Sequence, residues 1–220
     1  MYNDVMSKEL MKNGFKLSFG EEVGNSISHG VMAVLILISL PIVMAYVDAT
    51  KNMETAVGVG YYMICMFLMF IVSCLYHCMH YGTMQKYVFR KLDHIMILFA
   101  IAGTYTPICL SLLEKPMGYI VLAIEWICVF VGILVKAISK QTHKVFSMIL
   151  YMAMGWLAVF ILPTLLKTPQ FLALIVTGGL FYTVGAFFYS HPQRPYNHFI
   201  WHLCINAASI CHFIAIVFFM

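Results

Sequence analysis

The chain has 220 residues, of which 62% are hydrophobic and 10% are charged, and its formal net charge is +4. A soluble domain typically has about 45–50% apolar and about 25% charged residues. This composition therefore excludes a soluble globular domain and indicates an integral membrane protein. The basic residues are scattered and form no block of the kind that binds nucleic acid. We expect membrane lipids and no nucleic acid as partners, and the sequence does not identify which proteins, if any, it binds.

Seven apolar stretches predict an all-α, polytopic bundle of seven transmembrane helices, because a membrane helix needs about 20 apolar residues. The expected spans are 30–48, 57–77, 93–113, 118–136, 145–166, 171–190 and 199–219. Roughly 29 fairly polar residues precede the first stretch. A cleaved signal peptide would place its apolar region earlier, so we expect the first span to be retained. Pro41, Pro107 and Pro163 lie inside or near the ends of these spans, where they can kink a helix.

The number of lysine and arginine residues is alternately high and low in successive loops. Ten of them lie in the N-terminal segment and the second, fourth and sixth loops, whereas three (Lys51, Lys115 and Lys167) lie on the opposite side. Cytoplasmic loops of membrane proteins carry this excess of positive charge. We therefore expect a plasma-membrane protein whose N-terminus is cytoplasmic and whose C-terminus lies outside.

Five polar residues are expected at one membrane depth. In this topology, Ser73 and His77 lie at the cytoplasmic end of the second span, and Asp93 opens the third. His198 and His202 lie in the first two turns of the seventh span, on one face because they are four residues apart. Intramembrane histidine and aspartate are costly and usually functional. The pattern predicts a metal site near the cytoplasmic surface.

The predicted ligands are typical of a catalytic zinc site. Three neutral imidazoles and a water form a common arrangement of this kind. Asp93 would then be either a ligand or the acceptor that orients the metal-bound water, and zinc would make hydroxide available at neutral pH. A single histidine at a membrane interface is more often a polar anchor. The i, i+4 pair, the third histidine and the aspartate at matching depth together favour the metal site.

A second polar cluster lies at the start of the first helix. Glu22, Asn25 and His29 are spaced by three and four residues, so they share one helical face. Ser18 with Glu21 resembles a capping box that begins this helix. The cluster either lines the entrance of the site or is a helix end with satisfied polar groups, and spacing alone leaves both readings open.

Two further intramembrane polar residues have no assigned role. His212 lies about 15 Å along the helix from His202, at 1.5 Å per residue, which is too far to share the metal. We expect it to form a buried hydrogen bond. Glu125 lies near the middle of the fourth span without an evident partner, and an acid at such a position is a functional candidate.

These polar motifs, taken in order, resemble the bacterial hemolysin III family, which belongs with the progestin and adipoQ receptors. The motifs are Glu22-Val-Gly-Asn25-Ser-Ile-Ser28-His29, Ser73-Cys-Leu-Tyr-His77, Leu92-Asp93-His94, His191-Pro-x-Arg194 and Asn197-His198-x-x-Trp201-His202. The resemblance covers residues 18–220 as one membrane domain and leaves residues 1–17 as a cytoplasmic N-terminal segment. The set is specific because its members occur together and in order.

The resemblance implies a seven-helix bundle that holds Zn²⁺ through His77, His198 and His202. It further implies that Asp93 contacts the metal-bound water and that Ser73 lies beside the site. Among the receptor relatives, the proposed chemistry is hydrolysis of an amide-linked lipid. Bacterial members are described as cytolytic or pore-forming and have also been linked to membrane-lipid homeostasis.

Three functions follow as hypotheses. The first is a zinc-dependent lipid amidase or related hydrolase, with Asp93 and Ser73 as catalytic residues. The second is a membrane sensor, receptor or structural protein in which zinc holds the bundle together. The third is a cytolytic pore, but a conducting path needs polar residues along its length, and the outer halves of the spans are almost wholly apolar.

Overall fold

The computed structural model describes residues 16–138 and 144–220, and these form a helical bundle without strands. The long helices are α2 (Phe19–Thr50), α3 (Met53–Cys78), α4 (Met84–Ser111), α5 (Lys115–Ile138), α8 (Pro169–Ser190) and α9 (Asn197–Ile214). The shorter elements are α6 (Lys144–Trp156), the single turn η1 (Leu157–Val159), α7 (Leu162–Leu165) and the π-helical turn η2 (Ala215–Phe219). The prediction of an all-α membrane bundle is confirmed.

Six helices are long and apolar enough to cross a membrane, and 145–159 is a shorter apolar helical segment. The fifth predicted span, 145–166, is therefore not one continuous helix. Its first part, α6, has 13 residues and extends about 20 Å at 1.5 Å per residue, short of a bilayer core of about 30 Å. The chain then turns through η1 into α7, where Pro163 occupies the first turn, a position that needs no backbone N–H donor.

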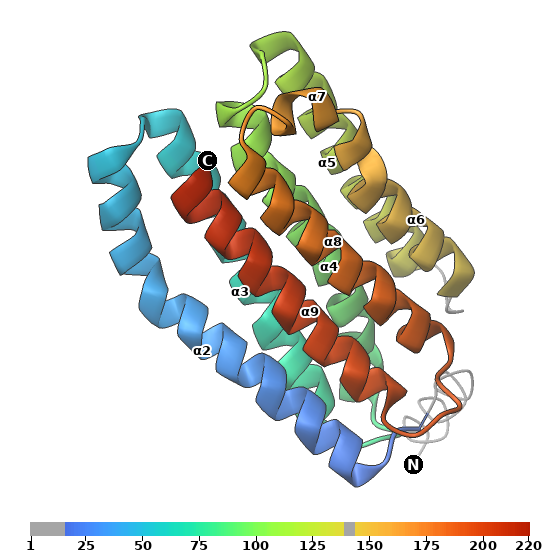
Figure 1. The fold of residues 1–220 in the computed structure, drawn as a ribbon. Coiled ribbons are helices and arrows are strands. Elements are labelled where there is room, and N and C mark those ends of the chain that lie inside the picture. Colours follow the sequence, from blue (N-terminus) through green and yellow to red (C-terminus); the bar gives the residue numbers. More distant parts are fainter. Residues whose placement is uncertain (1–15, 139–143) are drawn as a thin grey trace.

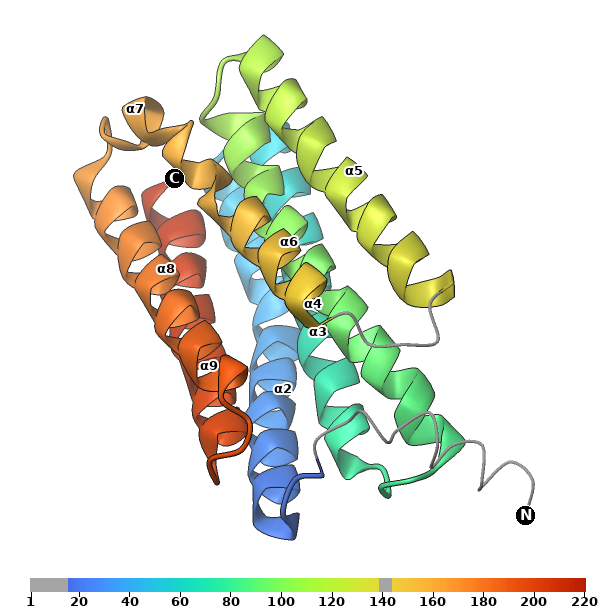
Figure 2. The same ribbon diagram turned by 90° about the vertical axis from the view of Figure 1, so that its right-hand side faces the viewer.

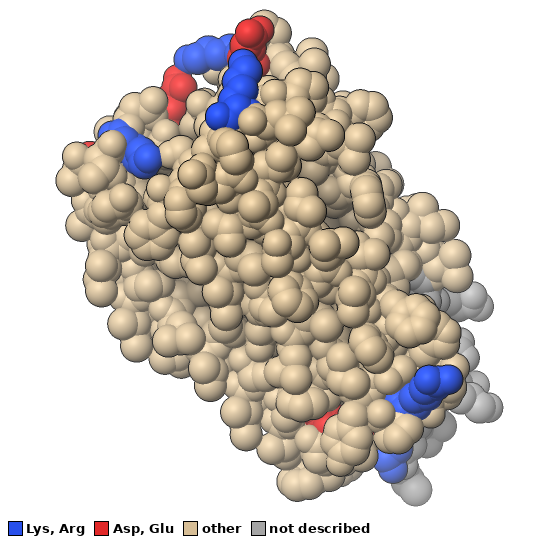
Figure 3. Space-filling view, in the orientation of Figure 1, with Lys and Arg blue, Asp and Glu red and all other residues tan. Residues whose placement is uncertain are grey.

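The helices run alternately up and down, so α2 begins at one end of the bundle and α9 with η2 finishes at the other (Figures 1 and 2). At that second end, Lys51 Nζ donates a hydrogen bond to the Met220 carbonyl at 2.6 Å. Charged side chains lie at both ends of the face in Figure 3, with an uncharged band between them. This is the distribution expected of a chain that crosses a bilayer.

Helices α3 and α4 form the centre of the bundle, and half of the most apolar window of each is buried. They pack closely because two glycines lie at their contact. A Cβ on Gly58 would stand 2.7 Å from Pro107 Cα, and one on Gly103 would stand 2.6 Å from Cys65 Cβ. Small residues at such contacts let membrane helices approach. Only 17% of the corresponding window of α2 is buried, so this helix presents most of its side chains to lipid.

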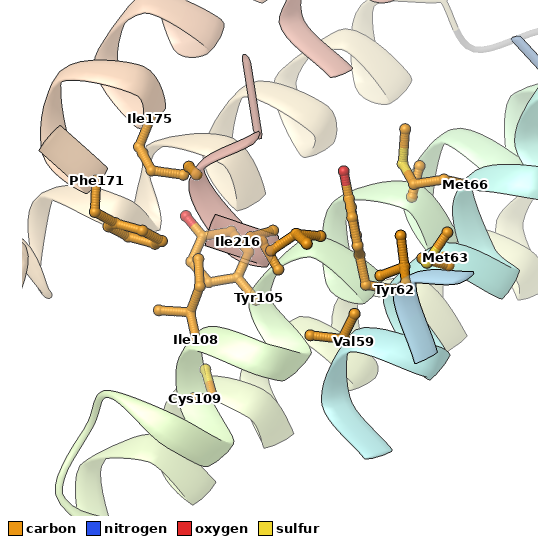
Figure 4. Close-up of a cluster of buried hydrophobic side chains, with 14 of the residues drawn as sticks. Val59, Tyr62, Met63, Met66, Tyr105, Ile108, Cys109, Phe171, Ile175 and Ile216 are labelled. Carbon is orange, nitrogen blue, oxygen red and sulfur yellow. The ribbon is translucent and has the colours of Figure 1, made fainter. Parts of the chain in front are cut away.

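The buried core joins the centre to the last helices. Figure 4 shows side chains of α3, α4, α8 and η2 meeting around Tyr62, Tyr105, Phe171 and Ile216. This cluster occupies the apolar part of the bundle. The polar residues predicted for the site lie at the other end, where α2, α4 and α9 begin and α3 finishes.

Candidate metal centre

Three histidines from two helices converge at one end of the bundle. His77 lies in the last turn of α3, and His198 and His202 lie in the first two turns of α9. One ligand atom from each lies within 4.8 Å of the other two, an arrangement that could hold a metal ion. His77 and His202 are each 3% exposed. The depth match expected from the sequence thus brings His77 next to two histidines that follow it by 121 positions or more.

The nitrogen atoms have a separation that suits tetrahedral zinc. Nε2 of His198 and Nε2 of His202 lie 3.2 Å apart. Two nitrogens of a tetrahedral zinc site, each about 2.0–2.1 Å from the metal, lie about 3.3 Å apart. Nε2 of His77 is buried and has no hydrogen-bond partner among the described residues. A buried nitrogen without a partner is costly, so the triad fits a cation that accepts all three lone pairs.

Glu22 determines which nitrogen of His77 keeps its lone pair for a metal. Its Oε2 lies 2.6 Å from His77 Nδ1. A carboxylate accepts and does not donate, so Nδ1 carries the proton and Nε2 keeps its lone pair for a metal. Carboxylates hold metal-binding histidines in this way and increase the basicity of the ligand. Glu22 therefore lies directly behind the triad.

Lys86 of α4 holds the other oxygen of Glu22. Lys86 Nζ lies 2.6 Å from Glu22 Oε1 and 4.7 Å from the centroid of the Tyr76 ring. The side chain is 1% exposed, and a buried ammonium requires such a partner. In the sequence, Lys86 is one of the ten basic residues assigned to the cytoplasmic side, and no other role is predicted for it. Its position two turns before Asp93, with Arg90 between them, is the one sequence signal that places it on the face of the site.

Glu21 positions the start of α9. Its Oε2 completes the capping box with Ser18, which confirms that prediction. Its Oε1 accepts a hydrogen bond at 2.8 Å from the backbone N–H of Tyr196, the residue before α9. Tyr196 has φ 63°, a conformation uncommon outside glycine and asparagine. The carboxylate thus links the first turn of α2 to the loop that carries His198.

Asn25 and His29 lie behind the triad in the core, 0% and 1% exposed. The ring of His29 stacks on that of His202, with centroids 3.9 Å apart, and meets Phe70 edge-on. The side-chain nitrogen and oxygen atoms of Asn25 and His29 have no hydrogen-bond partner among the described residues. The structure therefore brings the two residues next to the ligands, beside Glu22 on the same face of α2.

Asp93 and Ser73 meet beside the triad and not within it. Asp93 neighbours Ser73 and Arg90, and its side chain is 15% exposed. Ser73 is 2% exposed. The group of mutually close ligand atoms contains the three histidines, and Asp93 is not part of it.

An apolar cavity of about 300 Å³ lies between α4, α6, α8 and α9. Its wall includes Tyr189 and Trp201. The Tyr189 ring centroid lies 6.0 Å from that of His198, so one side chain of the cavity wall contacts a residue of the triad. The cavity extends to His212 and Leu165, toward the opposite end of the bundle.

The two intramembrane residues without a role remain apart from the triad. His212 Nε2 donates to the Ile175 carbonyl at 3.2 Å, as expected of a structural histidine. Glu125 is 0% exposed, and neither of its oxygens has a hydrogen-bond partner among the described residues. A further histidine, His143, lies outside the described residues.

The fold and the triad define a polytopic helical membrane protein with a histidine group suited to a metal ion. Residues 17–213 match the family model described as Haemolysin-III related. The chain belongs to this family, which confirms the resemblance found in its motifs.

Similar proteins extend the match over nearly the whole chain. The chain is 34% identical to Hemolysin-3 of Bacillus cereus over 202 residues, 91% of this chain and 92% of that protein. It is 30% identical to the Hemolysin-3 homolog of Bacillus subtilis (strain 168) over 205 residues, 90% and 94% of the two chains. It is also 27% identical to the human Monocyte to macrophage differentiation factor over 225 residues, 98% and 91% of the two chains.

Proposed function

We propose that this protein is a zinc-dependent hydrolase of amide-linked membrane lipids, with a role in membrane-lipid homeostasis. The observation that carries the proposal is one close group of three histidines, in which His77 Nε2 is buried and unpartnered and the other two Nε2 atoms lie 3.2 Å apart. Three histidine ligands leave a fourth position open, which is the pattern of catalytic zinc. Zinc held in this way activates water at neutral pH.

The neighbouring residues supply what a hydrolase needs besides the metal. Asp93 lies outside the ligand group, and its carboxylate would orient the attacking water and take its proton. Ser73 supports the carboxylate from α3. The apolar cavity suits an acyl chain, because it is lined mainly by hydrophobic side chains and one of its wall residues, Tyr189, contacts His198.

We further propose that the triad lies near the cytoplasmic face of the plasma membrane. Among the described residues, Lys16, Lys86, Arg90, Lys91, Lys136 and Arg194 lie at the end that carries the triad. Three basic residues, Lys51, Lys115 and Lys167, lie at the opposite end. This asymmetry favours a cytoplasmic N-terminus.

The proposal is tested with purified protein loaded with zinc and supplied with an N-acyl lipid. We expect release of free fatty acid, detected by mass spectrometry. His198→Ala should abolish it, whereas His80→Ala should not, because His80 is exposed and its ring hydrogen-bonds to the nearby Tyr81 carbonyl. Absence of turnover in zinc-loaded parent protein across N-acyl lipids would overturn the hydrolase and favour zinc as a structural element.

A further inference from the structure

Tyr189 of α8 lines the apolar cavity and also contacts His198 of the histidine triad. Its ring centroid lies 6.0 Å from that of His198 and 5.5 Å from that of Trp201, and it lines the cavity. Its hydroxyl oxygen lies 3.1 Å from His94 Nε2. No motif in the sequence pointed to Tyr189, and binding of a metal by the triad does not require it.

The direction of the Tyr189 hydrogen bond follows from the other side of the His94 ring. His94 Nδ1 lies 2.7 Å from the Arg90 backbone oxygen. A carbonyl oxygen only accepts, so Nδ1 carries the hydrogen, and Nε2 of the neutral imidazole is an acceptor. The Tyr189 hydroxyl must then donate its one hydrogen to His94. Its oxygen can accept a hydrogen bond and has none left to give.

Tyr151 of α6 also donates its hydroxyl hydrogen to His94. Its hydroxyl donates to the His94 backbone carbonyl at 2.6 Å, and Tyr151 also lines the cavity. His94 therefore uses its side chain and its backbone to engage the hydroxyl hydrogens of two cavity tyrosines. Tyr151 also has a hydrogen bond with Ser147, whereas the Tyr189 oxygen is left as an acceptor beside a largely apolar space.

We propose that Tyr189, fixed by His94, is a specificity-determining residue that accepts a hydrogen bond from the N–H of a secondary amide. The inference rests on the proposed function, in which the scissile carbonyl lies at the triad and the acyl chain lies in the cavity. An amide carries its N–H next to that carbonyl, whereas an ester of the same shape carries no donor there. An ester offers no donor to the Tyr189 oxygen in a desolvated site, and this unused acceptor costs free energy.

The test measures binding to the metal-free full-length protein, so that neither zinc nor turnover affects the measured affinity. The probes are N-propyl dodecanamide and its ester counterpart propyl dodecanoate, each competing with a fluorescent fatty-acyl probe in the same detergent. A net hydrogen bond of about 1 kcal/mol corresponds to a change of roughly fivefold in affinity. Tyr189→Phe should therefore lower the amide-to-ester affinity ratio by about five- to tenfold.

Tyr182→Phe is the matched control. Tyr182 lines the same cavity but bonds to Ser209 of α9, at 3.2 Å, away from the triad. This variant should keep the ratio of the parent. A ratio unchanged by Tyr189→Phe, or lowered equally by Tyr182→Phe, would overturn the inference.

A change in the ligand removes the donor without touching the protein. The N-methyl form of the amide should lose about five- to tenfold in affinity for the parent protein and little for Tyr189→Phe, so that the two changes are not additive. Equal losses in both proteins would contradict a bond to Tyr189. If the parent shows this coupling but hydrolyses no lipid, the amide site stands and the hydrolase proposal fails. If the protein hydrolyses the lipid but the coupling is absent, the hydrolase proposal stands and the role of Tyr189 fails.

Discussion

Glu22 and His77 form a carboxylate–imidazole pair in which Oε2 and Nδ1 lie 2.6 Å apart. The pair joins the first turn of α2 to the last turn of α3. Since Lys86 holds the second oxygen of the same carboxylate, three helices meet at one partly buried side chain. The orientation of the His77 ring toward the triad depends on this junction.

Glu22→Gln should weaken zinc binding by about 10–100-fold, the loss typical when the partner behind a metal-binding histidine is removed. The amide can still accept from His77, but its NH₂ group would then face the Lys86 ammonium, donor against donor. Zinc affinity measured by competition with a chelator checks this. Glu54→Gln is the matched control, because Glu54 pairs with Lys115 at the surface, also at 2.6 Å, where an ion pair contributes little. Equal zinc affinities for Glu22→Gln and parent would contradict the role of Glu22.

Purified protein should hold about one zinc per chain, as three converging imidazoles predict. His198→Ala removes one of three protein ligands and should sharply lower the zinc content measured by atomic spectroscopy. A double variant, His198→Ala with His202→Ala, that keeps full occupancy would show that the metal lies elsewhere.

Asp93→Asn should separate catalysis from scaffolding. The amide keeps nearly the shape of the carboxylate but removes the negative charge that would orient water and take its proton. We expect unchanged zinc content and thermal stability, together with loss of the lipid changes that expression of the parent causes. Lipid composition is compared at matched expression. Identical lipid profiles for parent, variant and empty vector would count against the hydrolase.

Reporter fusions should place the two ends of the chain on opposite sides of the membrane. A fusion after Lys140 should report the cytoplasm, and a fusion after Met220 should report the outside, because the excess of lysine and arginine lies on the side of the N-terminus. If both fusions report the same side, the number of crossings is wrong.

Gly178→Ala should destabilise the protein by about 1–3 kcal/mol, the usual cost of overpacking. A Cβ at this position would collide with the His212 ring and stand 3.1 Å from the Ala208 carbonyl oxygen, at the contact of α8 with α9. Gly179→Ala is the control, since nothing lies within 4 Å of a Cβ there. Thermal unfolding in detergent compares the two, and an equal melting temperature for both variants would refute the close contact.

Much of the triad could be predicted because its spacing is local. Two residues four apart share a helical face in any α-helix, so the spacing alone predicts that His198 and His202 lie together. His77 joined them through a depth argument, which needs only the order and direction of the spans. Neither step depends on how far a helix rotates about its own axis. The interruption of the fifth span after Trp156 was missed, because the hydropathy of residues 145–166 is continuous.

By itself, the sequence determined the membrane class, the alternation of basic loops and the depth of the polar residues, since composition and helical periodicity carry this information. Only the tertiary structure decided which polar groups touch. It joined Glu22 to His77 and Lys86, and His94 to Tyr189, across helices distant in the chain. Such contacts depend on the rotation of each helix and the rotamer of each side chain. Packing of the whole bundle sets both, and the pattern along one span does not record them.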